Sequence, residues 1–308
     1  MPNFGIYFEN QNMKKSNKLL FSALIAGILY VCPSSAQEQN ADSTGVPGDQ
    51  FSLQGALELF KQASSPEDFE KKINMEDNHV NNLDLNGDGE VDYIRVVSKM
   101  EGEVHAFVLQ VPVSETENQD IAVIELEKNG NESAMLQIIG DEDIFGEQII
   151  VEPQDENGGP EMEGKEGMKG GGPNPLYNDI EEMAIVINVW PWPCVRFVYG
   201  PAYRPWISPW RWRHYPVYWR PWRPFAWHVW HPFRHRHYHG FEIVHTHRVV
   251  HAHRIYAPHR TASVTVKTRH SASVGKYRVT KTKTTKTVTG PRGNKVKTTK
   301  TTTRVKRR

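Results

Sequence analysis

After residue 50, the hydrophobic positions recur with a helical period. Five apolar residues share one helical face: Leu53, Ala56, Leu57, Leu59 and Phe60. Ser52 precedes them in the position of an N-cap, so the pattern predicts a helix from there to about Gln62. A serine, a proline and two acids at residues 65–68 predict the start of a second helix, which ends near Met75.

Runs of β-branched or alternating residues follow, and they predict strands. The expected strands lie at residues 93–97, 105–111, 121–126, 133–139 and 148–151. The connections are short, and Asn129-Gly130 is a strong hairpin signal. Two N-terminal helices followed by an antiparallel β-meander define an α+β fold, which we assign to an acidic domain at residues 51–152.

The chain changes character after this domain. Residues 153–176 are rich in glycine and glutamate and are expected to form a flexible linker. All nine tryptophans lie between Trp190 and Trp230, in a Pro/Arg/His-rich segment placed at residues 177–260. Because frequent prolines remove backbone donors and exclude a long helix, a conventional buried core is not expected there.

The Trp/Arg-rich part of this segment suits contact with an anionic surface. Indole rings and guanidinium groups favour the boundary between apolar and charged material, where they stack and pair with phosphate. The residues expected to make this contact are Trp206, Trp210, Arg211, Trp212, Arg213, Trp219, Arg220, Trp222 and Arg223. The alternative is that these aromatic side chains pack on the acidic domain or form a small core of their own.

The formal net charge of +1 hides two oppositely charged halves. Residues 37–188 hold 34 acidic and 8 basic side chains, whereas residues 189–308 hold 26 Lys and Arg and a single acid, Glu242. Such a division indicates either an anionic partner for the basic half or two halves that mask each other. The last part, residues 261–308, is a basic Thr/Lys tail, expected to be a hairpin around residues 290–294 or disordered.

The N-terminus has the pattern of an export signal. Lysines precede an apolar run from Leu19 to Val31, and small residues ending at Ala36 form a cleavage site. We therefore assign residues 1–36 to a signal peptide, with Met13 as an alternative start and lipidation at Cys32 as the less favoured processing, and we expect residues 37–50 to be disordered. The apolar run is too short to span a bilayer, so the mature chain is expected in the periplasm or at the outer-membrane surface without a transmembrane span.

An Asp-rich stretch at residues 84–92 has the ligand spacing of a calcium loop. The expected oxygen ligands come from Asp84, Asn86, Asp88, the Glu90 carbonyl and Asp92. Over these residues the loop resembles those of EF-hands and dockerins, but Arg95 stands where an EF-hand has its bidentate glutamate, which predicts weak Ca²⁺ binding. The alternative is an Asx-rich turn that starts a strand.

The histidines form a second candidate site. Those from His231 to His259 all have odd numbers, and in an extended strand odd positions share one face. Four of them are candidate ligands of Zn²⁺, Cu²⁺ or Ni²⁺: His245, His247, His251 and His253. No cysteine or carboxylate is evident to complete the ligand set, so a basic surface that gains charge below about pH 6.5 is favoured over a metal site.

No catalytic constellation is evident in the sequence, because it has no nucleophile elbow, phosphate loop or zinc-protease helix motif. The protein is therefore expected not to be an enzyme. Nucleic acid suits the charge and aromatic content of the basic half, but export makes such binding adventitious.

Over most of its length, the chain resembles a group of uncharacterised exported proteins of Bacteroidetes bacteria. The resemblance is carried by residues 55–60, 82–95, 208–213 and 245–248. It implies an exported protein with this layout and does not imply a mechanism.

The main functional hypothesis is an exported binding protein whose basic aromatic half docks on anionic envelope material. Anionic lipid, lipopolysaccharide and acidic polysaccharide all fit that description, and calcium bound by the acidic half would tune the docking. The alternatives are a transition-metal-binding protein that acts through the histidines and a structural partner of another envelope protein.

Overall fold

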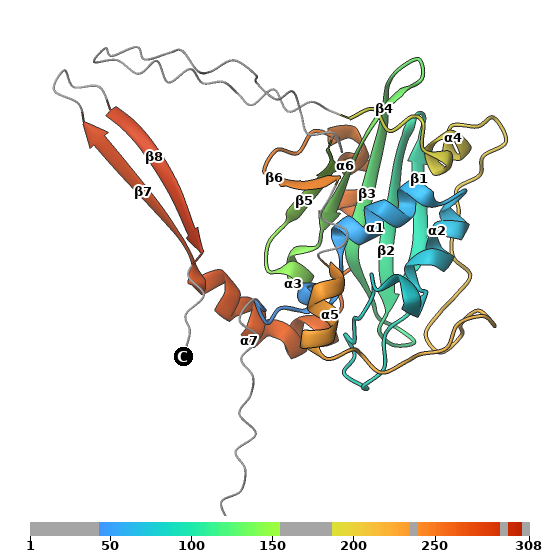
Figure 1. Ribbon diagram of the computed structural model, residues 1–308, viewed down its shortest axis with the longest axis horizontal. Coiled ribbons are helices and arrows are strands. Elements are labelled where there is room, and N and C mark those ends of the chain that lie inside the picture. The colour runs from blue at the N-terminus through green and yellow to red at the C-terminus, as the bar shows by residue number, and fades with distance from the viewer. Residues whose placement is uncertain (1–42, 155–186, 235–239, 290–294, 304–308) are drawn as a thin grey trace, which may run out of the picture. The chain divides into compact units, whose positions relative to one another are not determined.

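A six-stranded antiparallel sheet carries the fold, and its strands follow one another in chain order (Figure 1). The computed structural model describes residues 43–154, 187–234, 240–289 and 295–303, with side chains described up to residue 278. The strands are β1 (Arg95–Glu101), β2 (Val104–Pro112), β3 (Asn118–Gly130), β4 (Ser133–Gly140), β5 (Ile149–Pro153) and β6 (Phe241–Val244). The predicted α+β fold, with a meander after two helices, is confirmed. The predicted signal peptide and nearly all of the predicted linker lie outside the described residues.

The two predicted helices cover one face of the sheet (Figure 1). They are α1 (Leu53–Gln62) and α2 (Pro66–Ile73), and each begins at the predicted serine cap. The Ser52 side chain accepts a hydrogen bond from the Gly55 amide at 3.0 Å, and a cap of this kind stabilises a helix by about 1 kcal/mol. Phe60 of α1 packs edge-on against Phe69 of α2 and tilted against Phe107 of β2, at 5.3 Å between ring centroids in both cases.

The opposite face of the sheet is also buried. Phe107 and Leu109 point toward α1 and α2, whereas Ala106 and Val108 belong to a second core that includes Tyr256. Tyr256 ends α6 (Val250–Tyr256), a helix of the His-rich segment that packs across β1, β2 and β3. Because both faces are covered, polar residues that alternate along these strands are buried as well.

The Trp/Arg/His-rich half adds backbone pairing at both edges of the acidic domain's strands. At one edge β6 pairs with β5, with Ile243 opposite Val151. At the other edge, Ile207 bridges Val97 of β1, and the Ser98 amide donates to the Trp206 carbonyl at 2.8 Å. The acidic domain and the segment after it therefore share one sheet, within a unit that runs from residue 40 to residue 308.

Further short elements connect these parts. They are η1 (Pro47–Gln50), η2 (Glu76–Asn78), α3 (Glu142–Phe145), α4 (Pro193–Val198), α5 (Trp227–Arg234), η4 (Ala257–His259), α7 (Val264–Thr280) and the hairpin β7 (Lys281–Thr289) and β8 (Lys295–Thr303). The basic tail thus includes the hairpin alternative, although its first residues, up to Thr280, belong to α7.

The described end of the segment predicted to be disordered, residues 43–50, has a defined conformation. Asp49 is 7% exposed, and its carboxylate accepts hydrogen bonds from Ser43, Thr44 and Gly45. One buried carboxylate therefore orders the turn that precedes α1.

The expectation that the Trp-rich segment lacks a conventional core is wrong. All nine tryptophans are buried or half-buried, and Trp230 is fully buried with its Nε1 donating to the Asp49 carbonyl at 2.9 Å. Trp192 belongs to the main core together with Cys194, a free cysteine. The alternative that the aromatic side chains pack on the acidic domain therefore describes the structure. Among the described residues, no helix is long and apolar enough to cross a membrane.

His105 of β2 shows how closely this segment is packed. Its side chain is 2% exposed and makes edge contacts with Tyr199 and Tyr203, at 5.0 and 5.6 Å between centroids. Burial lowers the pKa of His105 to about 4, against a smaller opposing effect of Glu103. The imidazole is therefore neutral in the folded protein.

We expect His105 to make stability fall between about pH 6.5 and pH 4. In that window the unfolded chain binds a proton at this residue and the folded chain does not. The contribution of His105 to the free energy of unfolding is therefore complete above pH 6.5 and is lost as pH falls. A pKa difference of this size corresponds to about 3 kcal/mol. The free energy of unfolding, measured with urea at several pH values, should depend less steeply on pH for His105→Phe than for the parent protein.

A matched control is His228→Gln, because His228 is an exposed histidine of α5. This variant should keep the parent's pH dependence. Identical slopes for His105→Phe and the parent would contradict the assignment.

Candidate metal centre

The sheet face that packs against α6 carries buried acidic side chains. Those on the strands are Asp120, Glu125, Glu127 and Glu152, with exposed fractions of 0, 0, 9 and 7%. Residues 246–261, named the covering segment here, lie over these carboxylates. An unpaired buried carboxylate costs several kcal/mol, so each of them requires a partner from this segment or from the sheet.

The covering segment supplies a partner to each strand carboxylate. Glu152 pairs with Arg248 at 3.1 Å, and Glu127 accepts from the Ala252 amide at 2.7 Å. Asp120 accepts from the Thr261 amide at 2.8 Å. At the end of the segment, Arg260 pairs with Asp141 and Asp143 at 2.5 and 2.7 Å. The two oppositely charged halves of the chain therefore neutralise each other here.

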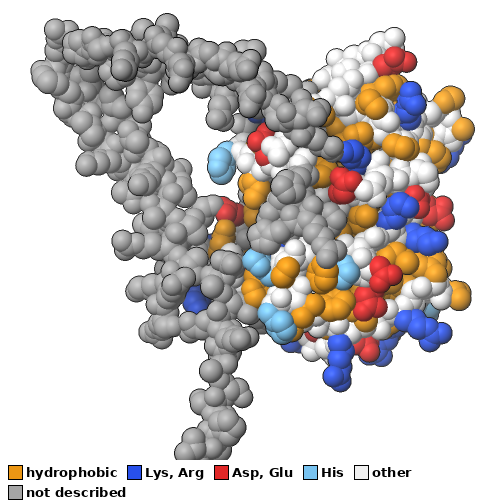
Figure 2. Space-filling model, viewed as in Figure 1, with side chains coloured by type: hydrophobic (Ala, Val, Ile, Leu, Met, Phe, Trp, Pro, Cys, Tyr) orange, Lys and Arg blue, Asp and Glu red, His pale blue; other side chains and the backbone are white. Residues whose placement is uncertain are grey.

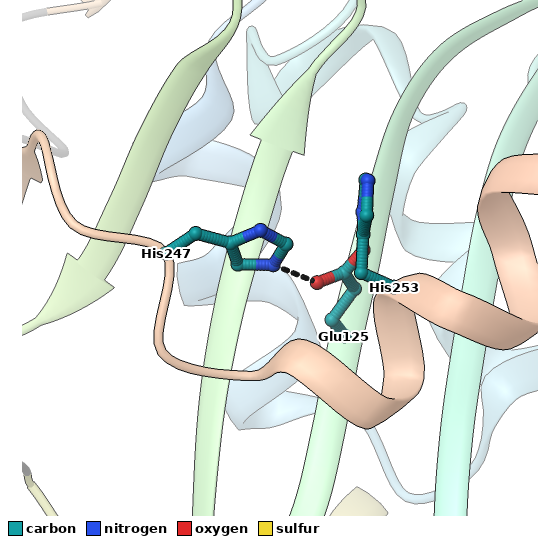
Figure 3. A group of neighbouring side chains, drawn as sticks. All are labelled: Glu125, His247 and His253. Atoms are coloured by element: carbon teal, nitrogen blue, oxygen red, sulfur yellow. Dashed lines mark hydrogen bonds and ion pairs between the residues drawn. The ribbon is translucent and has the colours of Figure 1, made fainter.

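Glu125 has the most unusual partners, two histidines (Figure 3). Its Oε2 lies 2.6 Å from His247 Nε2, and its Oε1 lies 2.7 Å from His253 Nδ1. The two imidazole rings are nearly perpendicular, with centroids 4.6 Å apart. Glu125 is fully buried, whereas the side chains of His247 and His253 are 25 and 28% exposed, so the group opens toward solvent on the histidine side.

Three different elements place these side chains. Glu125 rises from β3, His247 lies on the loop after β6, and His253 lies on α6. The helix brings His253 back over the loop because it begins at Val250, only three residues after His247. The Glu127 carboxylate accepts from an amide in the first turn of α6, where backbone donors lack partners within the helix.

The predicted row of histidines on one strand is therefore wrong in its geometry. β6 ends at Val244, so His245 follows the strand as an exposed residue, and His251 and His253 are helical. His251 Nδ1 lies 3.0 Å from Glu127 rather than in the Glu125 group. Of the four histidines in this less favoured metal-site alternative, the structure brings together His247 and His253.

Sequence reasoning missed Glu125, which supplies the carboxylate that the predicted ligand set lacked. Its side chain lies on the same face of β3 as Val123 and Glu127, in a run that reads as an ordinary alternating strand. The sequence does carry one signal, the acids at 125 and 127 on the same face of the strand. On a half-exposed strand that face would lie in water, so the two acids by themselves do not indicate a buried site. The covering segment that buries them begins about 120 residues later, and no local pattern links the two.

The electrostatics of the group favour a cation. A hydrogen bond to Glu125 raises the pKa of His253, against the opposing effect of partial burial. The protonated form of His253 is therefore favoured beside this carboxylate. A divalent metal ion can take the place of that proton, because metal ions replace protons on the same ligand atoms.

The ligand atoms suit a transition metal better than calcium. One oxygen and two imidazole nitrogens lie within 4.8 Å of one another, and this is the one such group of three among the described residues. Zn²⁺ accepts this donor set and commonly keeps a fourth position for water, whereas Ca²⁺ requires six to eight oxygens. Ligand atoms of a tetrahedral zinc site are about 3.3 Å apart, so small side-chain rotations suffice.

The predicted calcium loop is a tight turn whose oxygens serve its own amides. The Asp84 carboxylate accepts from the amides of Gly87, Asp88 and Gly89, at 2.6 to 3.1 Å. Gly87 and Gly89 both have positive φ, as such a turn requires. The Arg269 guanidinium of α7 packs so closely on Gly87 that a Cβ there would meet it at 2.2 Å.

The remaining members of the predicted calcium set extend this turn. Asn86 and Asp88 accept from the amides of Asp88 and Glu90, and Asp92 accepts from the Leu85 amide at 2.6 Å. Burial, with the nearby charges of Asp84 and Asp88, raises the pKa of Asp92 to about 7. The geometry is that of an Asx-rich turn, and calcium binding stays a prediction.

The residues predicted to contact an anionic surface divide into two groups. The tryptophans are less exposed: Trp219 is 5% exposed and packs on Tyr93, and Trp206, Trp210, Trp212 and Trp222 are partly buried. The arginines turn outward, and they are Arg211, Arg213, Arg220 and Arg223. Figure 2 shows Lys and Arg side chains beside hydrophobic ones along the margin of the visible face.

Residues 211–223, which carry these arginines, are named the arginine-rich loop here. A single buried carboxylate anchors the chain just before this loop. Glu70 of α2 is 1% exposed and accepts four hydrogen bonds of 2.8 to 2.9 Å, from the Tyr93 hydroxyl, the Val96 amide, Trp206 Nε1 and the Ser208 hydroxyl. Burial raises the pKa of Glu70, and these four donors oppose the rise by favouring the ionised form. Four donors around two oxygens leave no place for a proton, so the geometry favours the carboxylate.

No protein-family model, curated protein or solved structure matches this chain. The resemblance to exported Bacteroidetes proteins therefore stays a prediction.

We expect Glu70→Gln to lower the free energy of unfolding by about 2–4 kcal/mol. The amide nitrogen of glutamine would face donors that need an acceptor, so half of the hydrogen bonds are lost at a buried position. Urea unfolding followed by tryptophan fluorescence measures the loss, and Trp206 should become more exposed to water.

Glu67→Gln on the same helix is the matched control, because Glu67 is exposed. It should change stability by less than about 0.5 kcal/mol. Equal stabilities of the two variants would show that Glu70 does not anchor the loop.

Proposed function

We propose that the protein is an exported, non-enzymatic metal-binding protein that holds one transition-metal ion, with Zn²⁺ as the first choice, at Glu125, His247 and His253. The observation that carries the proposal is the convergence of a fully buried carboxylate and two imidazoles from three separate elements. The partners of the carboxylate support it, because Glu125 is held by two imidazoles, whose nitrogens exchange a proton for a metal ion, and not by neutral amide or hydroxyl donors.

The donor set decides which metals fit. Imidazole nitrogen and carboxylate oxygen suit Zn²⁺, Cu²⁺ and Ni²⁺, and the partial exposure of both histidines leaves room for a water ligand. Protons compete for the same nitrogens, so the affinity should fall as pH falls through the histidine range. The open position faces solvent, which suits capture and release of a metal from the surrounding medium.

Isothermal titration of metal-stripped protein with ZnCl₂ tests the proposal. We expect one ion per chain with submicromolar affinity. His247→Ala and His253→Ala should each weaken binding by at least about 100-fold, because a three-ligand site loses one ligand. Circular dichroism should show that both variants remain folded.

His245→Ala is the matched control, since His245 is exposed and lies outside the group. His251→Ala is a second control, because His251 pairs with Glu127. If the His247→Ala/His253→Ala double variant still binds Zn²⁺ as tightly as the parent, the metal lies elsewhere in the chain and the proposal fails.

A second candidate function is docking on anionic envelope material through the arginine-rich loop. The observation that favours it is that Arg211, Arg213, Arg220 and Arg223 are exposed and make no ion pair with an acid among the described residues. Glu70 is bound by Trp206 and Ser208, which precede these arginines along the chain. Each arginine near an anionic lipid surface contributes about 1 kcal/mol, screened by salt.

Co-sedimentation with neutral and anionic vesicles over a salt series tests this docking. We expect binding to anionic vesicles only, weakening as salt rises. Arg211→Gln/Arg223→Gln should lower the partition coefficient by about tenfold or more, since two surface charges are removed. The exposed pair Arg196→Gln/Arg254→Gln carries the same charge change away from this loop and should have a smaller effect. Equal effects of the two pairs would assign the binding to net charge rather than to the loop.

A further inference from the structure

A second site lies on the helix-facing side of the sheet, away from the metal centre. A pocket of about 430 Å³ opens over β5 and β6, between η1, α3, α5 and α7. Figure 1 shows α3, α5 and α7 gathered below the ends of these strands. Its volume falls within the range of small-molecule sites.

The walls of this pocket are mainly apolar. They are formed by Val46, Phe145, Ile149, Phe241 and Ile243, with the ring of Tyr277 on the α7 side. Ile243 is 58% exposed although it lies on a strand, and Phe241, two residues earlier, is 5% exposed. An apolar ligand would remove the exposed part of Ile243 from water, which is favourable.

Close glycine contacts hold the aromatic walls in place. A Cβ on Gly48 would lie 2.3 Å from the Phe145 ring, and a Cβ on Gly146 would lie 2.3 Å from the Tyr277 ring. The Tyr277 hydroxyl donates to Glu147 at 2.6 Å. Both rings therefore pack directly against glycine backbone.

One cation lines this apolar space. Arg234 of α5 donates from Nη1 to the Asp49 carbonyl at 3.0 Å, and its Nε is buried without a hydrogen-bond partner. A guanidinium has five N–H donors, and the hydrogen bond that Arg234 makes among the described residues uses one of them, on Nη1. Asp49 is the facing acid, 3.9 Å away, but its carboxylate already accepts from Ser43, Thr44 and Gly45.

We propose that this pocket binds an amphiphilic anion, an alkyl chain with a carboxylate or phosphate head, whose chain lies over Ile149, Phe241 and Ile243 and whose head pairs with Arg234. The combination of an apolar cavity and one under-used guanidinium distinguishes this class from neutral or cationic amphiphiles. The site shares no residue with the metal centre, so it does not depend on the proposed function.

Isothermal titration of the purified protein with dodecanoate, below its micelle concentration, tests the proposal. We expect one dodecanoate per chain. Butyrate, with the same head and a short chain, and dodecyltrimethylammonium, with the same chain and a positive head, should each bind at least about tenfold more weakly. Comparison with a lysophosphatidylglycerol of the same chain length shows whether the head is preferred as carboxylate or as phosphate.

Two variants locate the binding. Ile243→Glu places a charge on the exposed apolar wall, and Arg234→Met removes the guanidinium while keeping the stem. Each should weaken dodecanoate binding by about tenfold or more. Glu242→Gln is the matched control on the opposite face of β6 and should bind as the parent does.

Three results would overturn the assignment. They are no dodecanoate binding up to the micelle concentration, equal binding of the positive and negative dodecyl compounds, and unchanged binding by Ile243→Glu. Zinc titration of the same variants should match the parent, which separates a failure at this pocket from a failure at the metal centre.

Discussion

A carboxylate can be buried only where donors surround it, and this requirement organises the structure. The acidic half of the chain supplies the acceptors: Asp49 and Glu70 on the helix side of the sheet, and Asp120, Glu125, Glu127 and Glu152 on the other. The basic half supplies most of the donors, through the Trp206 indole, Arg248, Arg260 and the histidines of the covering segment. The near-zero net charge of the whole chain is thus matched by local pairing inside the fold.

The candidate metal centre is a special case of this pairing. Arg248 meets Glu152 with a permanent charge, whereas Glu125 meets two side chains whose charge depends on a proton or a metal ion. A site of this kind combines structural and binding roles, because the same contacts attach the covering segment to β3. The exposed arginines of the arginine-rich loop take no part in this internal pairing.

Local signals predicted much of the acidic half. Ser52 and the serine–proline start of α2 cap real helices, and the five strand patterns correspond to β1–β5. They could not predict that the Trp-rich segment is packed, because prolines exclude a long helix without excluding a core, and the partner of Trp206 lies 136 residues away. The valines around His251 favour a strand, yet a distant carboxylate, Glu127, accepts a first-turn amide and supports a helix.

Glu125 illustrates most clearly what local sequence patterns cannot predict. Alternation along β3 gives its side of the strand but not what covers that side, and the covering histidines are 122 and 128 residues further along the chain. Composition indicated that opposite charges could mask each other, and only the fold shows which residues meet.

The long separation between these partners has a consequence for how the protein folds. The hairpins of β1–β5 join neighbouring residues and can form quickly, whereas the covering segment must close a loop of more than a hundred residues. During that interval one face of the meander is bare, with apolar side chains such as Val108 and Val123 open to other chains. Asp120, Glu125 and Glu127 lie on that same face, and as free carboxylates they repel a second copy. We therefore expect the acids that hold the covering segment in the folded protein also to oppose aggregation of the sheet before that segment docks.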